Sequence, residues 1–310
     1  MAVAPQGRLG LSRGMSPRDF ALLMAMCLVW AVNTIVSKYV ISVLGAPPLF
    51  YAAARFAIVA ICLVPFLRPA PRPIWRLVLA AFLMGGGNFG LMFVGLQSAT
   101  PSAAAVVLQL GMPATLILSM LFLGERVRWR RALGIALTFA GVLTVMWNPH
   151  GLALSTGLML VAAATLMSAA GVILTKQIEG IRPIAFQAWV GWVSLFPMAA
   201  LSAWLEPGQL QIAWHAGWPF VAAVLFSAIV VSLGAHTLYV TLLQRYEANL
   251  ISALVLVTPL ATIILGVTLL HDPVGPRLVI GSLLALAGVL IIALRGSQVM
   301  ARLTALRDRT

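Results

Sequence analysis

The sequence predicts an all-α membrane protein whose ten transmembrane helices form two inverted five-helix repeats. Three observations predict this fold: the composition is strongly apolar, ten long apolar runs follow one another, and the two halves of the chain repeat each other. Apolar residues make up 62% of the 310 residues and charged residues only 9%. A soluble domain carries about 25% charged residues. This chain therefore has too little polar surface to cover a water-soluble fold.

Ten apolar runs are each about long enough to cross a bilayer, which takes about 20 residues of helix. Pro- and Gly-containing connections such as LGAPP, RPAPRP, NPHG and EPGQ separate several of them. Cys27 and Cys62 lie inside apolar runs, so we expect buried thiols without a disulfide. The predicted spans are Phe20–Ser37, Leu49–Leu67, Trp75–Leu96, Ser102–Leu123, Arg131–Trp147, Thr156–Thr175, Ile184–Leu205, Trp218–Leu243, Asn249–Leu270 and Pro276–Leu294.

The placement of basic residues gives the orientation. Of the 20 Lys and Arg residues, Lys38 and Arg277 fall on one side, Arg55 lies inside the second span, and the other 17 fall on the opposite side. Basic residues collect on the cytoplasmic side of membrane proteins. The excess of Arg over Lys is typical of GC-rich bacterial genomes. We therefore predict a multi-pass protein of the bacterial inner membrane with both termini cytoplasmic and, despite a net charge of +13, no nucleic-acid partner.

The two halves repeat at an offset of 147 residues. The segment LGERVRWRRALGIALTFAGVLTV from Leu123 resembles LHDPVGPRLVIGSLLALAGVLII from Leu270. At this offset the matching pairs are Glu125 with Asp272, Val127 with Val274, Gly134 with Gly281, Gly141 with Gly288, Gln97 with Gln244 and Gly87 with Gly234, while Pro113 and Pro259 match one residue out.

Five spans in each half make the repeats inverted, because an odd number of crossings starts the second half on the opposite side. Inverted repeats are the architecture of secondary transporters, which bind substrate near the midplane between the halves. The predicted organisation is a cytoplasmic N-terminal tail over 1–19, a first repeat over 20–148, a linker over 149–155, a second repeat over 156–295 and a cytoplasmic C-terminal tail over 296–310.

A glycine cluster in the third span has two interpretations. Gly85, Gly87 and Gly90 match the G-x-G-x-x-G pattern of dinucleotide-binding turns. No soluble strand precedes them, however, and no acidic residue about 20 positions on would hold a ribose. Gly86 and Gly90 are four residues apart and so lie on one helix face, where they let a neighbouring helix approach closely. We therefore predict helix packing beside a cavity.

Polar and aromatic side chains within spans are the candidate substrate-binding residues, because burying them in a membrane is costly. The amide of Asn33 can bind a carboxylate or an ammonium group, but it can also bond a neighbouring helix. The same alternative holds for His236, through a backbone carbonyl, and for Ser168, through its own helix. The predicted binding residues are Trp30, Asn33, Asn88, Gln109, Ser168, His236 and Tyr239.

Two prolines and two cations complete the candidates. Pro113 and Pro259 interrupt matching spans, each freeing a carbonyl one turn earlier, and have either a gating role or a packing role. For Arg55 we expect a structural role, with its guanidinium reaching the interface or bonding carbonyls, more than contact with substrate. Lys38 is expected to mark the outer interface.

No carboxylate lies in the middle of a span, which argues against proton coupling and against binding of cationic drugs. We find no catalytic triad, metal-ligand cluster or phosphate loop, so neither an enzyme nor a metal or cofactor is expected. The acidic residues all lie at span ends or in connections: Asp19, Glu125, Glu179, Glu206, Glu247, Asp272 and Asp308.

The chain resembles the EamA-type, ten-helix branch of the drug/metabolite transporter superfamily. The resemblance rests on VWAVNTIVSKY in the first span, AAARF in the second, and the P…LFLGERV…GIALTFAGV ending, and it covers nearly the whole chain. The second half departs from the pattern with Asp272 and Pro273, where a Glu-Arg pair is usual. Within the family, the chain is most similar to YddG-type exporters of aromatic amino acids.

The resemblance implies two inverted five-helix repeats and export of small metabolites, including amino acids. We expect polar groups to hold the ends of an amino acid while aromatic and Met side chains accept its large side chain. Export of nucleosides, vitamins or neutral drugs stays open, as do, less strongly, a channel and a membrane enzyme. The lipid bilayer is the expected surrounding. The sequence leaves the oligomeric state open, and a single chain would suffice.

Overall fold

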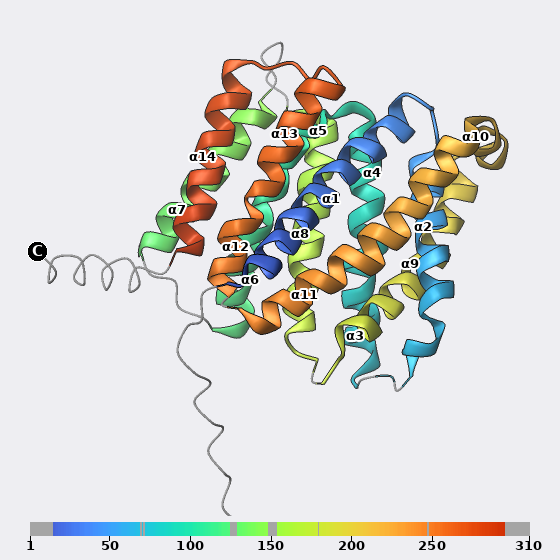
Figure 1. The fold of residues 1–310 in the computed structure, drawn as a ribbon, viewed down its shortest axis with the longest axis horizontal. Helices are drawn as coiled ribbons and strands as arrows, with labels where there is room; N and C mark the ends of the chain where they lie inside the picture. Colours follow the sequence, from blue (N-terminus) through green and yellow to red (C-terminus); the bar gives the residue numbers. More distant parts are fainter. Residues whose placement is uncertain are drawn as a thin grey trace, which may run out of the picture.

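The computed structural model describes residues 15–294 except 69, 71, 125–128, 148–153, 179 and 247. Most of the predicted N-terminal tail, all of the predicted C-terminal tail and most of the linker lie outside the described residues, as do Glu125, Glu179, Glu247 and Asp308. Ten helices in the described part are long and apolar enough to cross a membrane, as predicted. They run from Pro17–Ser42, Pro48–Leu67, Ile74–Ser98, Pro101–Phe122, Trp129–Met146, Thr156–Thr175, Pro183–Leu205, Gln209–Leu243, Leu250–Leu269 and Pro276–Ala293 (Figure 1).

Several spans consist of more than one helical element. The first repeat contains α1 (Pro17–Ser42), α2 (Pro48–Leu63), η1 (Val64–Leu67), α3 (Ile74–Phe82), η2 (Leu83–Gly87), α4 (Asn88–Ser98), α5 (Pro101–Val107), η3 (Leu108–Leu110), α6 (Gly111–Leu123) and α7 (Trp129–Met146). The second contains α8 (Thr156–Thr175), α9 (Pro183–Leu205), α10 (Gln209–Leu225), η4 (Phe226–Ala235), α11 (His236–Arg245), α12 (Ala248–Val255), α13 (Val257–Leu269) and α14 (Pro276–Ala293).

The eighth span begins earlier than predicted. Helix α10 starts at Gln209, nine residues before the predicted start at Trp218. Gly217 breaks the helix with a backbone φ of 62° and ψ of −149°, a conformation that glycine adopts without strain. The predicted start therefore matches the break, and much of the segment between the two predicted spans is a short helix that begins at Gln209.

Matching helices of the two repeats pack against each other. Helix α14 lies along α7 at one edge of the bundle, and α2 lies along α9 toward the other (Figure 1). The repeated glycines meet crosswise: a Cβ added at Gly134 would lie 2.7 Å from the carbonyl oxygen of Gly288, and one at Gly141 would lie 2.5 Å from that of Gly281. This arrangement is what two antiparallel copies of one helix produce, so the glycines of the repeat serve the contact between the repeats.

Two carboxylates of the second repeat hold helix N-termini of the first at the predicted outer end. Glu206 accepts hydrogen bonds from the backbone N–H groups of Leu49 (2.7 Å) and Phe50 (2.8 Å) in the first turn of α2. Asp272 does the same for Ser102 in the first turn of α5. First-turn N–H groups have no partner within their own helix, and the helix dipole favours an anion there. The carboxylates thus join the repeats without entering a span.

Gly86 and Gly90 lie against α9, where the backbones approach closely. A Cβ added at Gly86 would lie 3.3 Å from Cα of Ser194, and one at Gly90 would lie 3.0 Å from Sδ of Met198. The N–H of Gly86 also donates to Oγ of Ser194 at 2.7 Å. The segment η2 is a π-helix, so the contact forms where the regular hydrogen-bond ladder is disturbed.

One expectation about a single residue is wrong, and another is extended. The Cys62 side chain is exposed on the outside of α2 rather than buried, whereas Cys27 is buried as expected; neither forms a disulfide. Lys38 does more than mark an interface. Its Nζ donates to the carbonyls of Leu96 (2.6 Å) and Gln97 (3.2 Å), which end α4, because C-terminal carbonyls lack helical partners and attract a cation.

Candidate functional site

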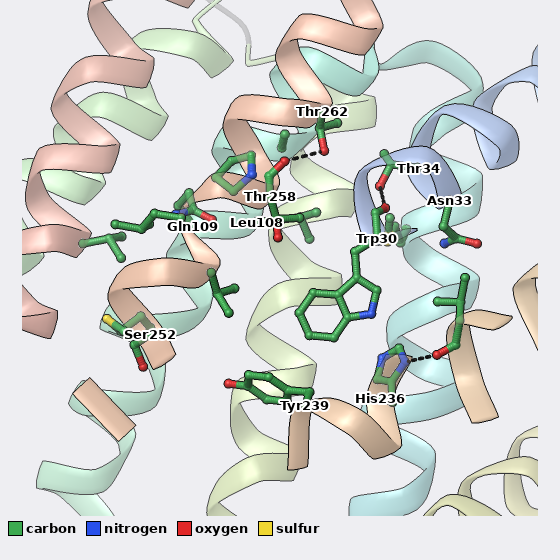
Figure 2. A pocket seen from close by; sticks show the side chains of 18 of the residues that line it. Trp30, Asn33, Thr34, Leu108, Gln109, His236, Tyr239, Ser252, Thr258 and Thr262 are labelled. Carbon is green, nitrogen blue, oxygen red and sulfur yellow. Dashed lines mark hydrogen bonds between the residues drawn. The ribbon is translucent and has the colours of Figure 1, made fainter. Parts of the chain in front are cut away.

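A cavity of about 360 Å³ lies between the repeats, near the middle of the spans (Figure 2). Helices α1, α2, α4 and α5–α6 line it from the first repeat, and η4, α11, α12–α13 and α14 line it from the second. Its volume falls within the range of small-molecule sites, about 300–1,000 Å³.

The cavity brings together five of the seven predicted binding residues: Trp30, Asn33, Gln109, His236 and Tyr239. Asn88 and Ser168 are not among the residues that line it. Phe89, the next residue after Asn88, faces the cavity, and successive helical residues point about 100° apart. Ser168 lies on α8, which packs against α4 and α6 and contributes no lining residue.

Aromatic rings form one wall. The ring of Trp30 lies 5.4 Å from that of His236 and 5.3 Å from that of Tyr239, measured between centroids. Nδ1 of His236 lies 2.8 Å from the carbonyl oxygen of Val231. Since a carbonyl only accepts, Nδ1 carries a proton, and in the neutral imidazole Nε2 is left as an acceptor. Figure 2 shows Trp30 above His236 and Tyr239.

Both spans that contain the predicted prolines are interrupted at the cavity. The fourth span changes from α5 through the 3₁₀ segment η3 to α6, and the ninth span breaks at Leu256 between α12 and α13. Pro113 and Pro259 have no N–H, so the carbonyls four residues earlier, at Gln109 and Val255, lose their helical donor. Both of these residues line the cavity. The third and eighth spans also match, because η2 and η4 are both π-helices.

A buried hydrogen-bond network links α1, α2 and η4 behind the cavity. The Ser227 hydroxyl donates to Oδ1 of Asn33 at 2.6 Å and lies 2.7 Å from the Tyr51 hydroxyl. Because the single proton of Ser227 is used on Asn33, Tyr51 donates to Ser227. The Asn33 oxygen thus accepts from Ser227, and the amino group of the same amide is a donor.

Arg55 contradicts the sequence-based expectation. In the described part of the chain the side chain neither reaches an interface nor bonds a carbonyl: it is 1% exposed and lines the cavity in mid-span. Its Nε donates to Oγ of Ser232 at 2.9 Å, and its Cζ lies 4.1 Å from the centre of the Phe89 ring. The π-helix η4 carries Ser232 to this position, and that distortion could not be read from the sequence pattern.

The sequence also did not single out several other lining residues. Met92 and Met112 give the wall polarizable apolar surface, and Thr34, Ser252, Thr258 and Thr262 give it hydroxyls. Helical Ser and Thr often bond their own backbone, as Thr34 does to Trp30 and Thr262 to Thr258, so their type alone is a weak signal. In the described part of the chain, Arg55 is the lining residue with a permanent charge, and no Asp or Glu lines the cavity.

The profile of the EamA-like transporter family matches residues 20–147 and residues 155–294. The chain belongs to the EamA-like transporter family. Two such units in one chain agree with the two inverted repeats, and the cavity lies between them. This EamA-like protein is a membrane transporter and not an enzyme.

Curated relatives are similar over most of their length. The chain is 28% identical over 288 residues to a probable amino-acid metabolite efflux pump of Salmonella typhimurium, covering 89% of this chain and 95% of that protein. The Escherichia coli protein with the same name is 26% identical over 289 residues, with the same shares covered. An uncharacterized transporter, YvbV of Bacillus subtilis, is 27% identical over 288 residues, covering 89% of this chain and 91% of that one.

A solved crystal structure has the same fold. It superposes with a TM-score of 0.60 and covers 94% of this EamA-like chain and 99% of its own, at 18% sequence identity. At 18% identity the similarity shows only that the helices are arranged in the same way.

Proposed function

We propose that this transporter exports small amphipathic metabolites, above all amino acids with aromatic or other large neutral side chains. Transport occurs by alternating access: the two repeats rock about the cavity, which opens to one side of the membrane and then to the other. The membrane is a bacterial inner membrane, and both termini are cytoplasmic.

The single observation that supports this proposal most is the meeting of helix breaks from both repeats at one cavity. In secondary transporters, interrupted helices expose backbone carbonyls to substrate at the midplane. Here the breaks at η3 and Leu256 bring free carbonyls to a wall that also carries aromatic rings. The polar groups gather at one cavity, as in a binding site, and do not form the continuous stripe through the spans that a channel requires.

The chemistry of the wall supports an amino acid with a large apolar side chain. The rings of Trp30, Phe89 and Tyr239 and the side chain of Met112 give one apolar surface. Amide and imidazole groups supply the donors and acceptors that an α-amino and an α-carboxyl group need. The names of the Salmonella and Escherichia relatives agree with a substrate derived from amino acids.

Nucleosides, vitamins and neutral drugs are the second candidates, because a flat ring of any of them fits an aromatic wall. A labelled panel that contains these classes and the aromatic amino acids separates the candidates. The purified protein is reconstituted in proteoliposomes, and counterflow is measured for each compound. We expect phenylalanine or tryptophan to exchange fastest, and exclusive exchange of nucleosides would overturn the substrate class.

A matched pair of variants ties transport to the cavity. Tyr239→Ala removes a ring from the wall, whereas Tyr39→Ala removes a ring that is 42% exposed on the outside of α1. We expect loss of exchange in the first variant and unchanged exchange in the second. Equal rates would show that transport does not use this cavity.

A reporter that is active only in the cytoplasm tests the orientation. Fused to Thr310, it should be active, because both termini are cytoplasmic.

A further inference from the structure

The cavity holds hydrogen-bond donors that have no acceptor. Nη1 of Arg55 and Nε1 of Trp30 are buried and make no hydrogen bond in the described chain. The amino group of Asn33 is also available, because its amide oxygen is the atom held by Ser227. All three side chains line the cavity. Indole and guanidinium nitrogens only donate, so what this part of the wall lacks is an acceptor.

The guanidinium is fixed, with part of its donor set unused. Nε is bound to Ser232, and one face lies over the Phe89 ring. These contacts orient the guanidinium, whose N–H groups form a planar fork of donors, without neutralising its charge. A hydroxyl and an aromatic ring carry no negative charge. A buried guanidinium keeps its charge, and buried charges in proteins are normally paired. Among the lining residues of the described chain no carboxylate is present to pair with it.

One polar network links two of these donors, Arg55 and Asn33. The Ser232 hydroxyl that accepts from Arg55 donates in turn to the carbonyl of Ser227, and the Ser227 hydroxyl donates to Asn33. Trp30 lies one helical turn before Asn33 on α1, so both face the same way. The donors therefore face the cavity from α1 and α2, and η4 positions those of Arg55 and Asn33.

We infer that Arg55 binds the carboxylate of the transported amino acid, with the indole N–H of Trp30 and the amide of Asn33 as further donors, so that ligands without a carboxylate bind weakly. The inference rests on the proposed function, since it takes the cavity as the transport site. A carboxylate supplies two acceptor oxygens and the missing negative charge, and the fork of Arg matches it geometrically. An α-ammonium group finds only neutral acceptors here, such as Nε2 of His236, and restores a net positive charge.

Three ligands that share a phenyl ring but differ in net charge test the inference. The probes are 3-phenylpropionate (anion), phenylalanine (zwitterion) and phenethylamine (cation), each used to inhibit counterflow in proteoliposomes or to shift the melting temperature of the purified transporter. We expect the anion to bind at least tenfold more tightly than the cation, with the zwitterion between them. Equal binding of the three, or preference for the cation, would overturn the inference.

Variants then locate the charge. Arg55→Gln should reduce the preference for the anion at least tenfold, and Arg55→Lys should retain part of it, because the charge stays while the fork is lost. Arg277→Gln removes an exposed guanidinium at the outer end and should change nothing. If Arg55→Gln does not fold, the ligand series on the wild-type protein and on Arg55→Lys still decides. If the preference for the anion stays unchanged in both Arg55→Lys and Trp30→Phe, the assignment of the carboxylate to these residues is contradicted.

The failure of this inference differs from failure of the proposed function. Exchange that proceeds without regard to ligand charge refutes the role of Arg55 but leaves the exporter. Absence of exchange for every class of compound, with cavity variants that behave like the wild type, refutes the exporter itself.

Discussion

Asp272 in the second repeat accepts hydrogen bonds from Ser102 in the first repeat, from its backbone N–H at 2.9 Å and from its hydroxyl at 2.6 Å. The left-handed backbone of His271, with a φ of 56°, turns the chain just before this carboxylate. The side chain of Asp272 is 7% exposed, so water competes little for the contact. A buried acid that departs from the family pattern is thus a link between the repeats.

Removing this link should destabilise the protein. Asp272→Ala leaves the Ser102 N–H without a partner at the first turn of α5, and loss of such a cap costs about 0.5–2 kcal/mol. Thermal unfolding of the purified protein in detergent measures the effect. Gln211→Ala, at an exposed position on α10, is the control and should unfold like the wild type. Equal melting of the two variants would show that the cap contributes nothing.

The two packing glycines should differ in their tolerance of a methyl group. At Gly86 the added Cβ meets the backbone of Ser194, whereas at Gly90 it meets the flexible end of Met198. We therefore expect Gly90→Ala to transport almost normally, Gly86→Ala to be impaired, and Leu at either position to prevent folding or flux. Expression level and counterflow measure this order. Normal flux with Leu at both positions would refute the packing account.

Two polar residues of the cavity should contribute to affinity. Removing one hydrogen bond to the substrate, by Asn33→Ala or His236→Ala, should weaken binding roughly 2- to 10-fold, since such a bond is worth about 0.5–1.5 kcal/mol. Ser168→Ala is the control, because Ser168 does not line the cavity. A substrate titration of counterflow gives the affinities. If both cavity variants insert normally and match the control, these groups serve only to hold helices together.

Transport should not require a proton gradient. No lining residue of the described chain is Asp or Glu, and His236 is the one imidazole among them. Counterflow should therefore persist when ionophores abolish the pH gradient and the membrane potential. Accumulation against a gradient, driven by an imposed pH difference, would contradict this. Loss of that accumulation in His236→Asn would then place the coupling at the imidazole.

Much of the architecture could be predicted from the sequence, because membrane solvation imposes simple rules. Apolar length gave the ten spans, and the repeated glycines of the fifth and tenth spans marked the contact that α7 and α14 make. The prolines marked the breaks at the cavity, since a missing N–H has the same effect in any helix.

The site itself was less accessible to prediction. The polarity of Asn88 predicts a side chain in the cavity, but the π-helix η2 precedes it and Phe89 takes the cavity-facing position. Arg55 was expected to reach an interface, because on an isolated helix that lowers its cost. Its partners, Ser232 and Phe89, come from other helices, so only the packed structure shows them. The direction in which a side chain points depends on how its helix is rotated about its own axis in the bundle. The amino-acid composition does not determine that rotation.

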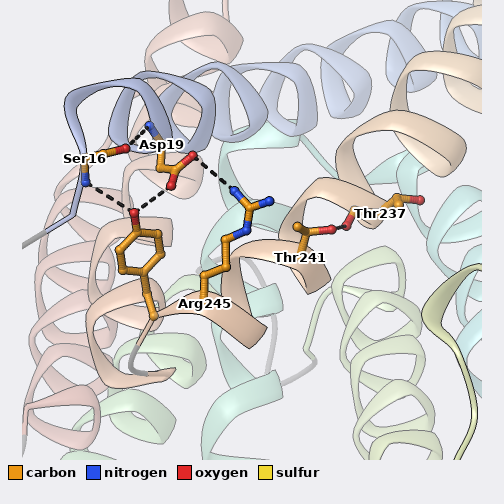
Figure 3. Close-up of polar contacts among 6 residues, drawn as sticks. Ser16, Asp19, Thr237, Thr241 and Arg245 are labelled. Atoms are coloured by element: carbon orange, nitrogen blue, oxygen red, sulfur yellow. Dashed lines mark hydrogen bonds and ion pairs between the residues drawn. The ribbon is translucent and has the colours of Figure 1, made fainter. Parts of the chain in front are cut away.

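A second cluster joins the repeats at the predicted cytoplasmic end. The Asp19 carboxylate on α1 accepts from the Tyr246 hydroxyl at 2.6 Å and lies 3.7 Å from Nη1 of Arg245 (Figure 3). The Ser16 N–H donates to the same Tyr246 oxygen at 3.3 Å. With Asp272 and Glu206 at the other end, polar links between the repeats lie on both sides of the cavity. Alternating access requires such links to break in turn.

Accessibility of the cavity from both sides tests the central claim most directly. In a variant in which Cys27 and Cys62 are replaced by Ala, Gln109→Cys places one thiol at the break between α5 and α6. A membrane-impermeant maleimide is applied to inside-out and to right-side-out vesicles, with and without phenylalanine. The account predicts labelling from both sides and protection by the ligand. Labelling from one side only under every condition, or from neither, would contradict alternating access through this cavity.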